Sequence, residues 1–319
     1  MHFRSIADLH ADILSGLHKI PRDVDVVVGV ARSGMLPATM IALALNVPLA
    51  EMNSFAHGRL LGSGKTRRVK RMNVDFEDVR HALVVDDSID TGGSMLEARA
   101  VLAPLADRIK FTFLAAYGVK ADPAPADVIL ATVPQPRVFE WNALHHAILS
   151  RACVDIDGVL CHDPTDEEND DGERYLRFLT QARPRTIPTK KIASLVTSRL
   201  EKYRPETEAW LKANGVEYGE LIMLDLPTAE ERRRAGVHGS FKGEYYKRSK
   251  AEIFIESELA QAQTIANISG KPVLSLEGPV MCEPGNLSPV RLAARAIHRS
   301  PLRKLVSKIK WRLVKAVKA

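Results

Sequence analysis

The stretch Ala82-Leu-Val-Val-Asp-Asp-Ser-Ile-Asp-Thr-Gly-Gly-Ser94 carries the strongest structural signal in the chain. It begins with a short apolar run, Ala82–Val85, continues with two adjacent carboxylates, and ends in small residues that open a helical pattern. A short β-branched run bounded by turn-forming residues is typical of a buried parallel strand. The stretch therefore predicts a strand, a tight loop and a helix, in that order.

Strand and helix patterns alternate on both sides of this stretch. Further buried strands are expected at Val24–Val30 and Phe111–Ala116, and helices at Leu36–Ala44 and Ser94–Leu105. Such alternation predicts an α/β fold with a mainly parallel sheet.

A second series of strands follows, so we expect two Rossmann-like α/β domains. A length of 319 residues fits two domains of about 100–200 residues each. We place the first domain at 1–150, the second at 151–280, and a linker with a basic tail at 281–319. The strands expected in the second domain are Ala152–Ile156, Ile192–Val196, Leu221–Leu224, Glu252–Ile255 and Pro272–Leu276.

Composition narrows the class of protein. Three scattered cysteines do not form a disulfide framework, the N-terminus lacks the apolar core of a signal peptide, and no apolar run reaches the length of a membrane span. We therefore expect a cytoplasmic protein.

The net charge of +6 comes from the tail, where ten Lys and Arg follow Asn286 without an acid, leaving 35 basic against 39 acidic residues elsewhere. A mildly acidic body argues against nucleic acid as a partner.

The loop after the strand Ala82–Val85 has the chemistry of a phosphate site. Free backbone N–H groups at a helix start hold a dianion, and Gly92 and Gly93 let the backbone approach it. Thr91 and Ser94 add hydroxyl donors, and Asp86 and Asp87 can accept from two ribose hydroxyls. The run, with Asp90, resembles the motif that binds phosphoribosyl pyrophosphate (PRPP) in type I phosphoribosyltransferases. The alternative is an acidic N-cap on an ordinary Rossmann-like unit.

Two upstream segments extend the resemblance. The turn Arg32-Ser33-Gly34 after the first strand resembles the pyrophosphate loop of the family. The segment His57–Arg68, with Lys65 and Arg67, resembles its mobile catalytic loop, although a solvated charged loop is the alternative. A P-loop is excluded because Arg59 stands where that motif needs its first glycine. The resemblance implies displacement of pyrophosphate from C1 of PRPP with inversion, assisted by Mg²⁺ and the cationic loop.

The acceptor site of the family is variable in sequence. Pro136-Arg-Val-Phe-Glu-Trp-Asn142 carries aromatic faces that could stack on a sugar or a base. The same segment could equally serve as packing between the domains.

A second candidate site begins at Cys153-Val-Asp-Ile-Asp-Gly-Val-Leu160, where a buried strand ends in Asp-x-Asp. Hydrolysis of a phosphomonoester through a covalent intermediate needs one carboxylate as nucleophile and another as acid and base. The stretch resembles the first motif of the haloacid-dehalogenase superfamily. The resemblance implies that Asp155 is the nucleophile and Asp157 the acid/base.

The later motifs of that superfamily have counterparts in the same order. Thr197 and Ser198 end the next strand, as a phosphate-binding hydroxyl does in the second motif. Lys242 is our choice for the third-motif lysine, with Lys247 and Lys250 as rivals. Glutamates replace the usual aspartates of the fourth motif, so we expect Mg²⁺ at Asp155, Asp157 and Glu256, with Glu258 in reserve. The segment Leu160–Lys190 is long enough only for a small cap.

The tail has the pattern of a basic amphipathic helix. Over 302–317 apolar residues recur at three- and four-residue spacing, with Lys and Arg on the other side. Such a helix can dock on an anionic membrane, or it can pack on its own body or on a second subunit.

The two resemblances together suggest one product. A phosphatase fused to a phosphoribosyltransferase removes the 5-phosphate that a nucleotide would keep. We therefore expect a ribofuranosyl transfer system acting on a glycan or lipid-linked glycan acceptor in a bacterial surface polysaccharide. One alternative is a nucleobase phosphoribosyltransferase with nucleotidase activity in salvage, and another is a regulatory protein that senses PRPP.

Overall fold

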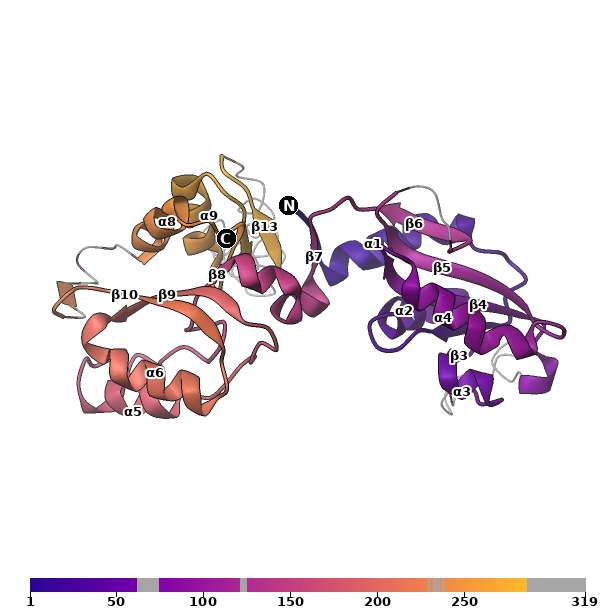
Figure 1. The fold of residues 1–319 in the computed structure, drawn as a ribbon, viewed down its shortest axis with the longest axis horizontal. Helices are drawn as coiled ribbons and strands as arrows, with labels where there is room; N and C mark the ends of the chain where they lie inside the picture. The colour runs from indigo at the N-terminus through magenta and orange to yellow at the C-terminus, as the bar shows by residue number, and fades with distance from the viewer. Residues whose placement is uncertain are drawn as a thin grey trace, which may run out of the picture. The chain divides into compact units, whose positions relative to one another are not determined.

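The structure is a computed structural model that describes residues 1–61, 75–120, 125–228, 230, 231, 234, 236 and 238–285. Lys65 and Arg67 of the expected catalytic loop and the tail segment 302–317 lie outside these residues. The chain forms two compact units (Figure 1), the first spanning Met1–Trp141 and the second beginning at Asn142. The sequence places the domain boundary near Ser150. None of the helices in the described part of the chain has the length and apolar character needed to cross a bilayer.

The first unit is built on a five-stranded sheet with the strand order β3-β2-β4-β5-β6. All four pairings in this sheet are parallel, as the strand–helix alternation predicts. Its strands are β2 (Val26–Gly29), β3 (Leu49–Glu51), β4 (His81–Ile89), β5 (Lys110–Gly118) and β6 (Val128–Thr132).

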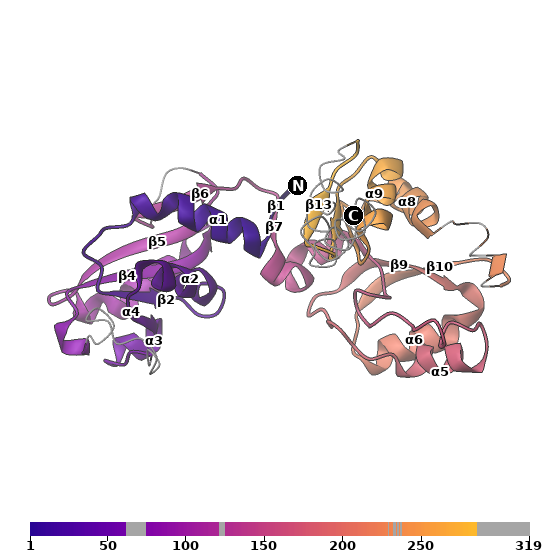
Figure 2. The same cartoon turned by 180° about the vertical axis from the view of Figure 1, so that it is seen from behind.

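Helices cover both faces of this sheet. Alternate residues of each strand face opposite sides, so Val27, Leu83 and Leu114 pack with α1 and α2, while Val26, Val84 and Phe113 pack with α3 and α4. Figure 2 shows α1 and α2 on one face of the sheet. The helices are α1 (Ile6–Gly16), α2 (Met35–Leu45), α3 (Met52–Ala56) and α4 (Gly93–Leu102), with short 3-10 turns η1 (Leu17–Lys19), η3 (Phe76–Asp78) and η4 (Ala103–Leu105).

A separate two-stranded sheet pairs β1 (His2–Arg4) with β7 (Arg137–Phe139) in parallel. Phe139 is buried in the core of the first unit and stacks between Tyr117 and Trp141, with ring centroids 5.3 Å and 4.8 Å away. The Phe139 ring is therefore committed to packing within the first unit.

The second unit contains a six-stranded sheet with the order β10-β9-β8-β11-β12-β13. The first five strands are parallel, and β13 pairs with β12 in the antiparallel sense. Met281 and Cys282, which the sequence assigns to the start of a linker, belong to β13 because the chain turns back at Glu277 and Gly278 and completes the sheet edge. The strands are β8 (Ala152–Val154), β9 (Ile192–Leu200), β10 (Tyr218–Leu224), β11 (Ile253–Glu256), β12 (Val273–Ser275) and β13 (Val280–Cys282).

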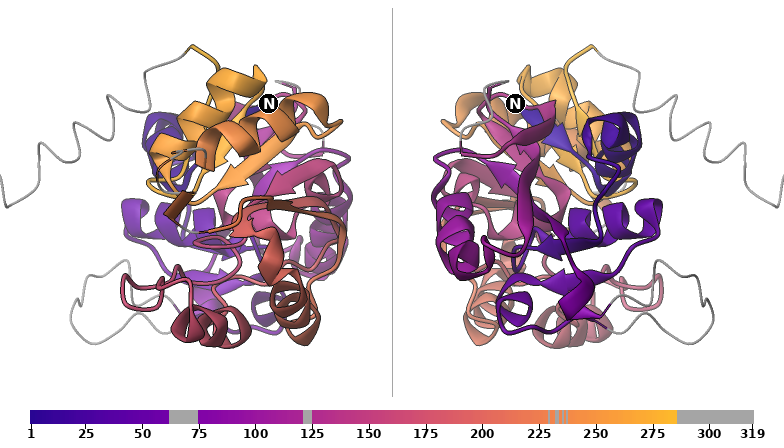
Figure 3. Two further views of the ribbon diagram at one scale, coloured as in Figure 1. Left: turned by 90° about the vertical axis from the view of Figure 1, so that its left-hand side faces the viewer. Right: turned by 90° about the vertical axis from the view of Figure 1, so that its right-hand side faces the viewer.

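Helices also flank this second sheet. Tyr246 of α8 and Ala262 and Ile265 of α9 pack on Cys153 and Phe254 of the sheet in one core. Figure 3 shows α5 and α6 on the opposite face. The helices are α5 (Glu173–Gln181), α6 (Arg204–Ala213), α8 (His238–Arg248) and α9 (Leu259–Ser269), with 3-10 turns η5 (Glu140–His145), η6 (Ala147–Arg151) and η7 (Glu201–Tyr203).

Each sheet has one place where the strand order reverses. In the first unit the chain runs from β2 outward to β3 and returns to β4 on the other side of β2. In the second unit it runs from β8 through β9 to β10 and returns to β11 on the other side of β8. Ligands of open α/β sheets bind at the carboxyl ends of the strands at such points. Both candidate sites lie there.

Candidate active sites

The first candidate site lies at the carboxyl end of β4. Asp86 and Asp87 are both buried, and Asp86 lines a cavity of about 290 Å³. The rest of the lining comes from Ser88 to Met95, which includes the predicted residues Asp90, Thr91, Gly92, Gly93 and Ser94. Strand β4 continues to Ile89 because its pairing with β5 extends to Gly118. The two carboxylates are therefore held in the strand, and the loop begins after them.

Burial and charge change the acidity of Asp86. Removal from water, reinforced by the neighbouring Asp87 carboxylate, raises the pKa of Asp86 to about 7. Asp86 accepts a hydrogen bond from the backbone N–H of Asp87 at 2.8 Å. A carboxyl group with this pKa titrates near neutral pH, which makes the cavity sensitive to pH.

Glycines shape the loop between β4 and α4. Gly92 has a φ of 85°, and a Cβ there would lie 2.5 Å from Pro125 Cδ, so the loop needs glycine. Helix α4 begins at Gly93 with its first N–H groups at the cavity lining. This is the geometry that anions prefer at helix N-termini.

The turn Arg32-Ser33-Gly34 follows β2 and meets β4 from the side. A Cβ on Gly34 would lie 2.5 Å from Val30 O, 2.7 Å from Val85 O and 2.9 Å from Asp86 Cα. Ser33 Oγ donates to Asp87 Oδ1 at 2.9 Å, whereas Arg32 is exposed. The structure thus brings Ser33 and Gly34 to the two carboxylates, while Arg32 remains at the surface.

The second candidate site lies at the carboxyl ends of β8 and β11. Lys242 Nζ donates to Asp155 Oδ2 at 2.6 Å and to Glu256 Oε2 at 2.8 Å, and all three side chains are buried. Lys247 and Lys250 are exposed. Burial raises the pKa of Asp155 well above its usual value even though Lys242 opposes this, because Glu256 and Asp157 add negative charge. Lys242 is therefore the lysine whose positive charge is paired with the carboxylate of Asp155, the predicted nucleophile.

Arg199 is a member of this site to which the sequence reasoning gave no role. Its Nη2 donates to Asp157 Oδ1 at 2.6 Å and its Nε donates to Asp157 Oδ2 at 3.1 Å, and its side chain is fully buried. Burial alone would raise the pKa of Asp157, but the Arg199 charge holds it below its ordinary value. The available signal was an arginine within the apolar run of β9, which an unpaired cation would not occupy.

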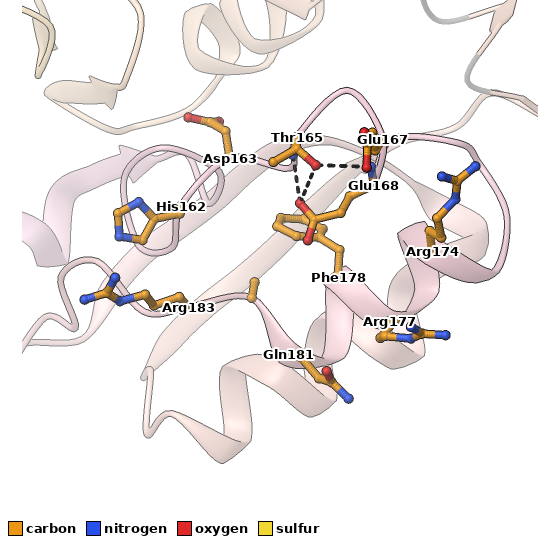
Figure 4. Close-up of a pocket in the computed structure, with 11 residues that line it drawn as sticks. His162, Asp163, Thr165, Glu167, Glu168, Arg174, Arg177, Phe178, Gln181 and Arg183 are labelled. Atoms are coloured by element: carbon orange, nitrogen blue, oxygen red, sulfur yellow. Dashed lines mark hydrogen bonds between the residues drawn. The ribbon is translucent and has the colours of Figure 1, made fainter.

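The predicted hydroxyls lie beside the same cavity. Thr197 and Ser198 line a space of about 240 Å³ together with Asp155, Asp157 and Lys242. A larger cavity of about 580 Å³ is lined by residues between His162 and Arg183 and is drawn in Figure 4. It is lined by residues of the loop before α5, by residues of α5 and by Ala182 and Arg183 after it, and Asp163 lines both cavities. The larger cavity is therefore next to the acidic site but does not contain Asp155.

The donor set fits a divalent cation in part. Asp155 and Glu256 offer the carboxylate oxygens that Mg²⁺ prefers, but Asp155 Oδ2 and Glu256 Oε2 already accept hydrogen bonds from Lys242 Nζ at 2.6 Å and 2.8 Å. Both side-chain oxygens of Asp157 are bound to Arg199, so this carboxylate fits a metal less well. Within the described residues no group of three or more His, Cys, Asp or Glu side chains is arranged to hold a metal.

Comparisons with known proteins bear on the first unit. Residues 2–130 match the family model described as "Phosphoribosyl transferase domain". No curated protein matches the chain.

Solved structures similar to the chain include three phosphoribosyltransferases. The xanthine-guanine-hypoxanthine enzyme of Helicobacter pylori is 19% identical over 44% of this chain and 92% of its own, with a TM-score of 0.34. The purine enzyme of Pyrococcus horikoshii is 18% identical over 44% and 92%, with a TM-score of 0.33. The orotate enzyme of Aeropyrum pernix is 21% identical over 40% and 70%, with a TM-score of 0.29.

The matched residues include both parts of the first site. These are the turn after β2, and the two carboxylates of β4 with the loop that follows that strand. The match to the phosphoribosyl transferase domain model thus supports the resemblance of the first unit, and it extends over residues 2–130 of the 319 in the chain.

Proposed function

We propose that this chain transfers the 5-phosphoribosyl group of PRPP to a glycan acceptor and then removes the 5-phosphate. The observation that carries the first step is the cavity at the end of β4, where a buried carboxylate, Asp86, and the glycine loop at the start of α4 line the same space. A carboxylate for ribose hydroxyls and an N–H cradle for the 5-phosphate are the two groups that a phosphoribosyl ligand needs.

The transfer step breaks the bond from C1 to the pyrophosphate oxygen and forms a bond from C1 to the acceptor hydroxyl oxygen, whose proton passes to the departing pyrophosphate. The loop residues Thr91 to Ser94 hold the 5-phosphate, and Asp86 orients the ribose, so the sugar keeps its position as positive charge develops at C1. Mg²⁺, when bound with PRPP, supplies charge neutralisation of the leaving pyrophosphate.

For the second step we propose Asp155 as the nucleophile on the 5-phosphate. Its carboxylate lies beside Lys242 at 2.6 Å, and Thr197 and Ser198 line the same cavity. The Arg199 ion pair opposes protonation of Asp157, which supports a role for Asp157 as the base that activates water over a role as the acid. Asp155 and Glu256 are the residues that would hold Mg²⁺ at this site.

The combination favours a plain β-ribofuranosyl group as the product, because the second step removes the phosphate that a nucleotide would keep. A glycan or lipid-linked glycan is the proposed acceptor. Contact of 302–317 with an anionic membrane belongs to the same proposal, since the sequence of this segment alternates apolar and basic positions.

The test is incubation of the full chain with PRPP, MgCl₂ and short oligosaccharide acceptors, with product masses followed over time. The wild type should yield a pentosylated product without phosphate. Asp155→Asn should stop at the phosphopentosyl form, because it lacks the nucleophile of the second step only.

Asp86→Asn is the matched control. It should lose the transfer step while still releasing phosphate from a phosphopentosyl glycan made by Asp155→Asn. Loss of both steps in Asp155→Asn would count against two separate sites, and turnover of PRPP with a free nucleobase would favour salvage instead.

A further inference from the structure

The segment Gln135–Trp141 makes three side-chain hydrogen bonds to the end of β4 and the loop that follows. Gln135 Nε2 donates to Asp90 Oδ2 at 3.1 Å, Arg137 Nη2 donates to Ile89 O at 2.9 Å, and Trp141 Nε1 donates to Asp87 Oδ2 at 2.8 Å. Along the segment the donor residues rise in number from 135 to 141, while the acceptor residues fall from 90 to 87. The segment thus lies antiparallel to residues 87–90 and holds them at three points.

Asp86 and Asp87 differ in their contacts and in whether they face the cavity. Asp87 Oδ1 accepts from Ser33 Oγ at 2.9 Å, and Asp87 Oδ2 accepts from Trp141, so both of its oxygens already have donors. Asp86 lines the cavity, whereas Asp87 does not. Hydrogen bonds from neutral donors to a carboxylate are charge-assisted, and burial strengthens them further.

The ring of Trp141 is itself held in place. It stacks on Phe139 with a centroid separation of 4.8 Å and an interplanar angle of 3°, and Phe139 stacks on the buried Tyr117. An indole fixed in this way offers its N–H in one direction at little further entropic cost. Its contact with Asp87 is therefore a built feature of the first unit.

We propose that Trp141 is a positioning residue for the PRPP site. Together with Ser33 it holds Asp87 as a fixed carboxylate that ties the end of β4 to the turn after β2 and to the segment Gln135–Trp141. Asp86 is then the carboxylate that contacts the ribose. This inference rests on the proposed binding of PRPP and divides the work of the two acids, which the family resemblance assigns jointly to the ribose.

The test is isothermal titration of PRPP, in the presence of MgCl₂, into the full chain and its variants. Trp141→Phe keeps an aromatic ring in the stack and removes the N–H donor. It should weaken PRPP binding about tenfold, which corresponds to about 1.4 kcal/mol. Binding that is unchanged or tighter would overturn the proposal, because it would mean that Asp87 must leave Trp141 to reach the ligand.

Tyr117→Phe is the matched control. It removes one hydroxyl donor, which bonds Asp12 Oδ2 at 2.9 Å, from the same aromatic stack but not from the phosphate loop. It should leave the PRPP affinity within about twofold. An equal loss in both variants would show that the stack, and not the Asp87 contact, carries the effect.

A double-mutant cycle with Asp87→Asn identifies the route of the effect. If Trp141 acts through Asp87, the double variant binds PRPP no more weakly than Asp87→Asn alone. Additive losses would overturn the proposal. Absence of PRPP binding by the wild type would overturn the proposed function and this inference together, whereas wild-type binding with an unaffected Trp141→Phe would overturn the inference alone.

Discussion

Asp86 keeps a titratable carboxyl group in a place from which water is largely excluded. Burial and the Asp87 carboxylate raise the pKa of Asp86 from its ordinary value of 3.8 to about 7. Between these two pH values the folded protein keeps the Asp86 proton, whereas the unfolded chain has released it. The free energy of unfolding contributed by this group therefore falls as the pH rises from about 4 to about 7. Such a cost is typical of residues kept for binding.

We predict that Asp86→Asn raises the free energy of unfolding at about pH 8 and changes it little at about pH 4 or below, because the cost of burying this carboxyl group develops only as the pH rises above its ordinary pKa. The gain should be on the order of a few kcal/mol. Urea unfolding of both proteins at the two pH values measures it. A variant less stable than the wild type at the higher pH would contradict the assigned direction of the pKa.

Two glycines of the first site allow a second prediction at the residue scale. Gly34→Ala places a Cβ against three backbone atoms, one just after β2 and two in β4, whereas Gly93→Ala places one 4.0 Å from Thr91 Oγ1, its nearest neighbour. Gly34→Ala should lower the free energy of unfolding by about 1–3 kcal/mol. Gly93→Ala should leave stability unchanged or improved, since alanine favours helices.

The same pair separates folding from binding. The added methyl group at Gly93 borders the cavity at the end of β4, so Gly93→Ala should weaken the proposed PRPP binding without loss of stability. Thermal unfolding and PRPP titration of both variants provide the check. Equal destabilisation by the two substitutions would contradict the close approach at Gly34.

At the scale of elements, β9 places three side chains of the second candidate site near the carboxyl end of the strand. The strand ends at Leu200, so Thr197, Ser198 and Arg199 lie among its last four residues. Arg199 is fully buried, and its charge is balanced by Asp157 at 2.6 Å. An ion pair of this kind is costly to break because one charge is left behind.

We expect Arg199→Met to lower the free energy of unfolding by about 3–5 kcal/mol. Adding Asp157→Asn should restore part of this loss, since the carboxylate without a partner is then removed. Arg177→Met, at an exposed position of α5, is the control and should stay within about 0.5 kcal/mol of the wild type. Chemical unfolding of the four proteins tests the order. No recovery in the double variant would mean that Arg199 acts by packing rather than by charge.

At the scale of the whole molecule, each unit has its own sheet and its own hydrophobic cores. Val27 and Leu83 lie in one core of the first unit and Val84 in the other, whereas Cys153 and Phe254 lie in a core of the second. Units with separate cores can unfold in separate steps.

We predict two unfolding transitions in calorimetry, of which PRPP with MgCl₂ shifts one. At a ligand concentration of about 100 times Kd the shift should amount to about 2.7 kcal/mol. Asp86→Asn should abolish the shift, and Asp155→Asn should leave it intact. A single transition that moves as a whole would contradict independent units.

Local sequence determined the α/β class and most of the strands. Short, β-branched apolar runs bounded by turn residues lie at the centres of β2, β4, β5 and β8 to β12. Such runs predict strands that are buried on both faces of a sheet. The glycine loop was equally readable, because only a few residue types allow the backbone of residues 90–94 to approach an anion. Short elements such as β1, β3 and β13 escaped, since their pairing partners are distant or their runs are too brief to show a period.

Only the tertiary structure decided which charged groups meet. Arg199 and Asp157 are 42 residues apart, Asp87 and Trp141 are 54 apart, and Lys242 and Asp155 are 87 apart. A side chain's charge and size are local properties, but its partner and its pKa depend on the order in which the strands lie in the sheet. For that reason the sequence could propose two acids for one ribose, while the folded chain distinguishes Asp86, facing the cavity, from Asp87, held by two donors.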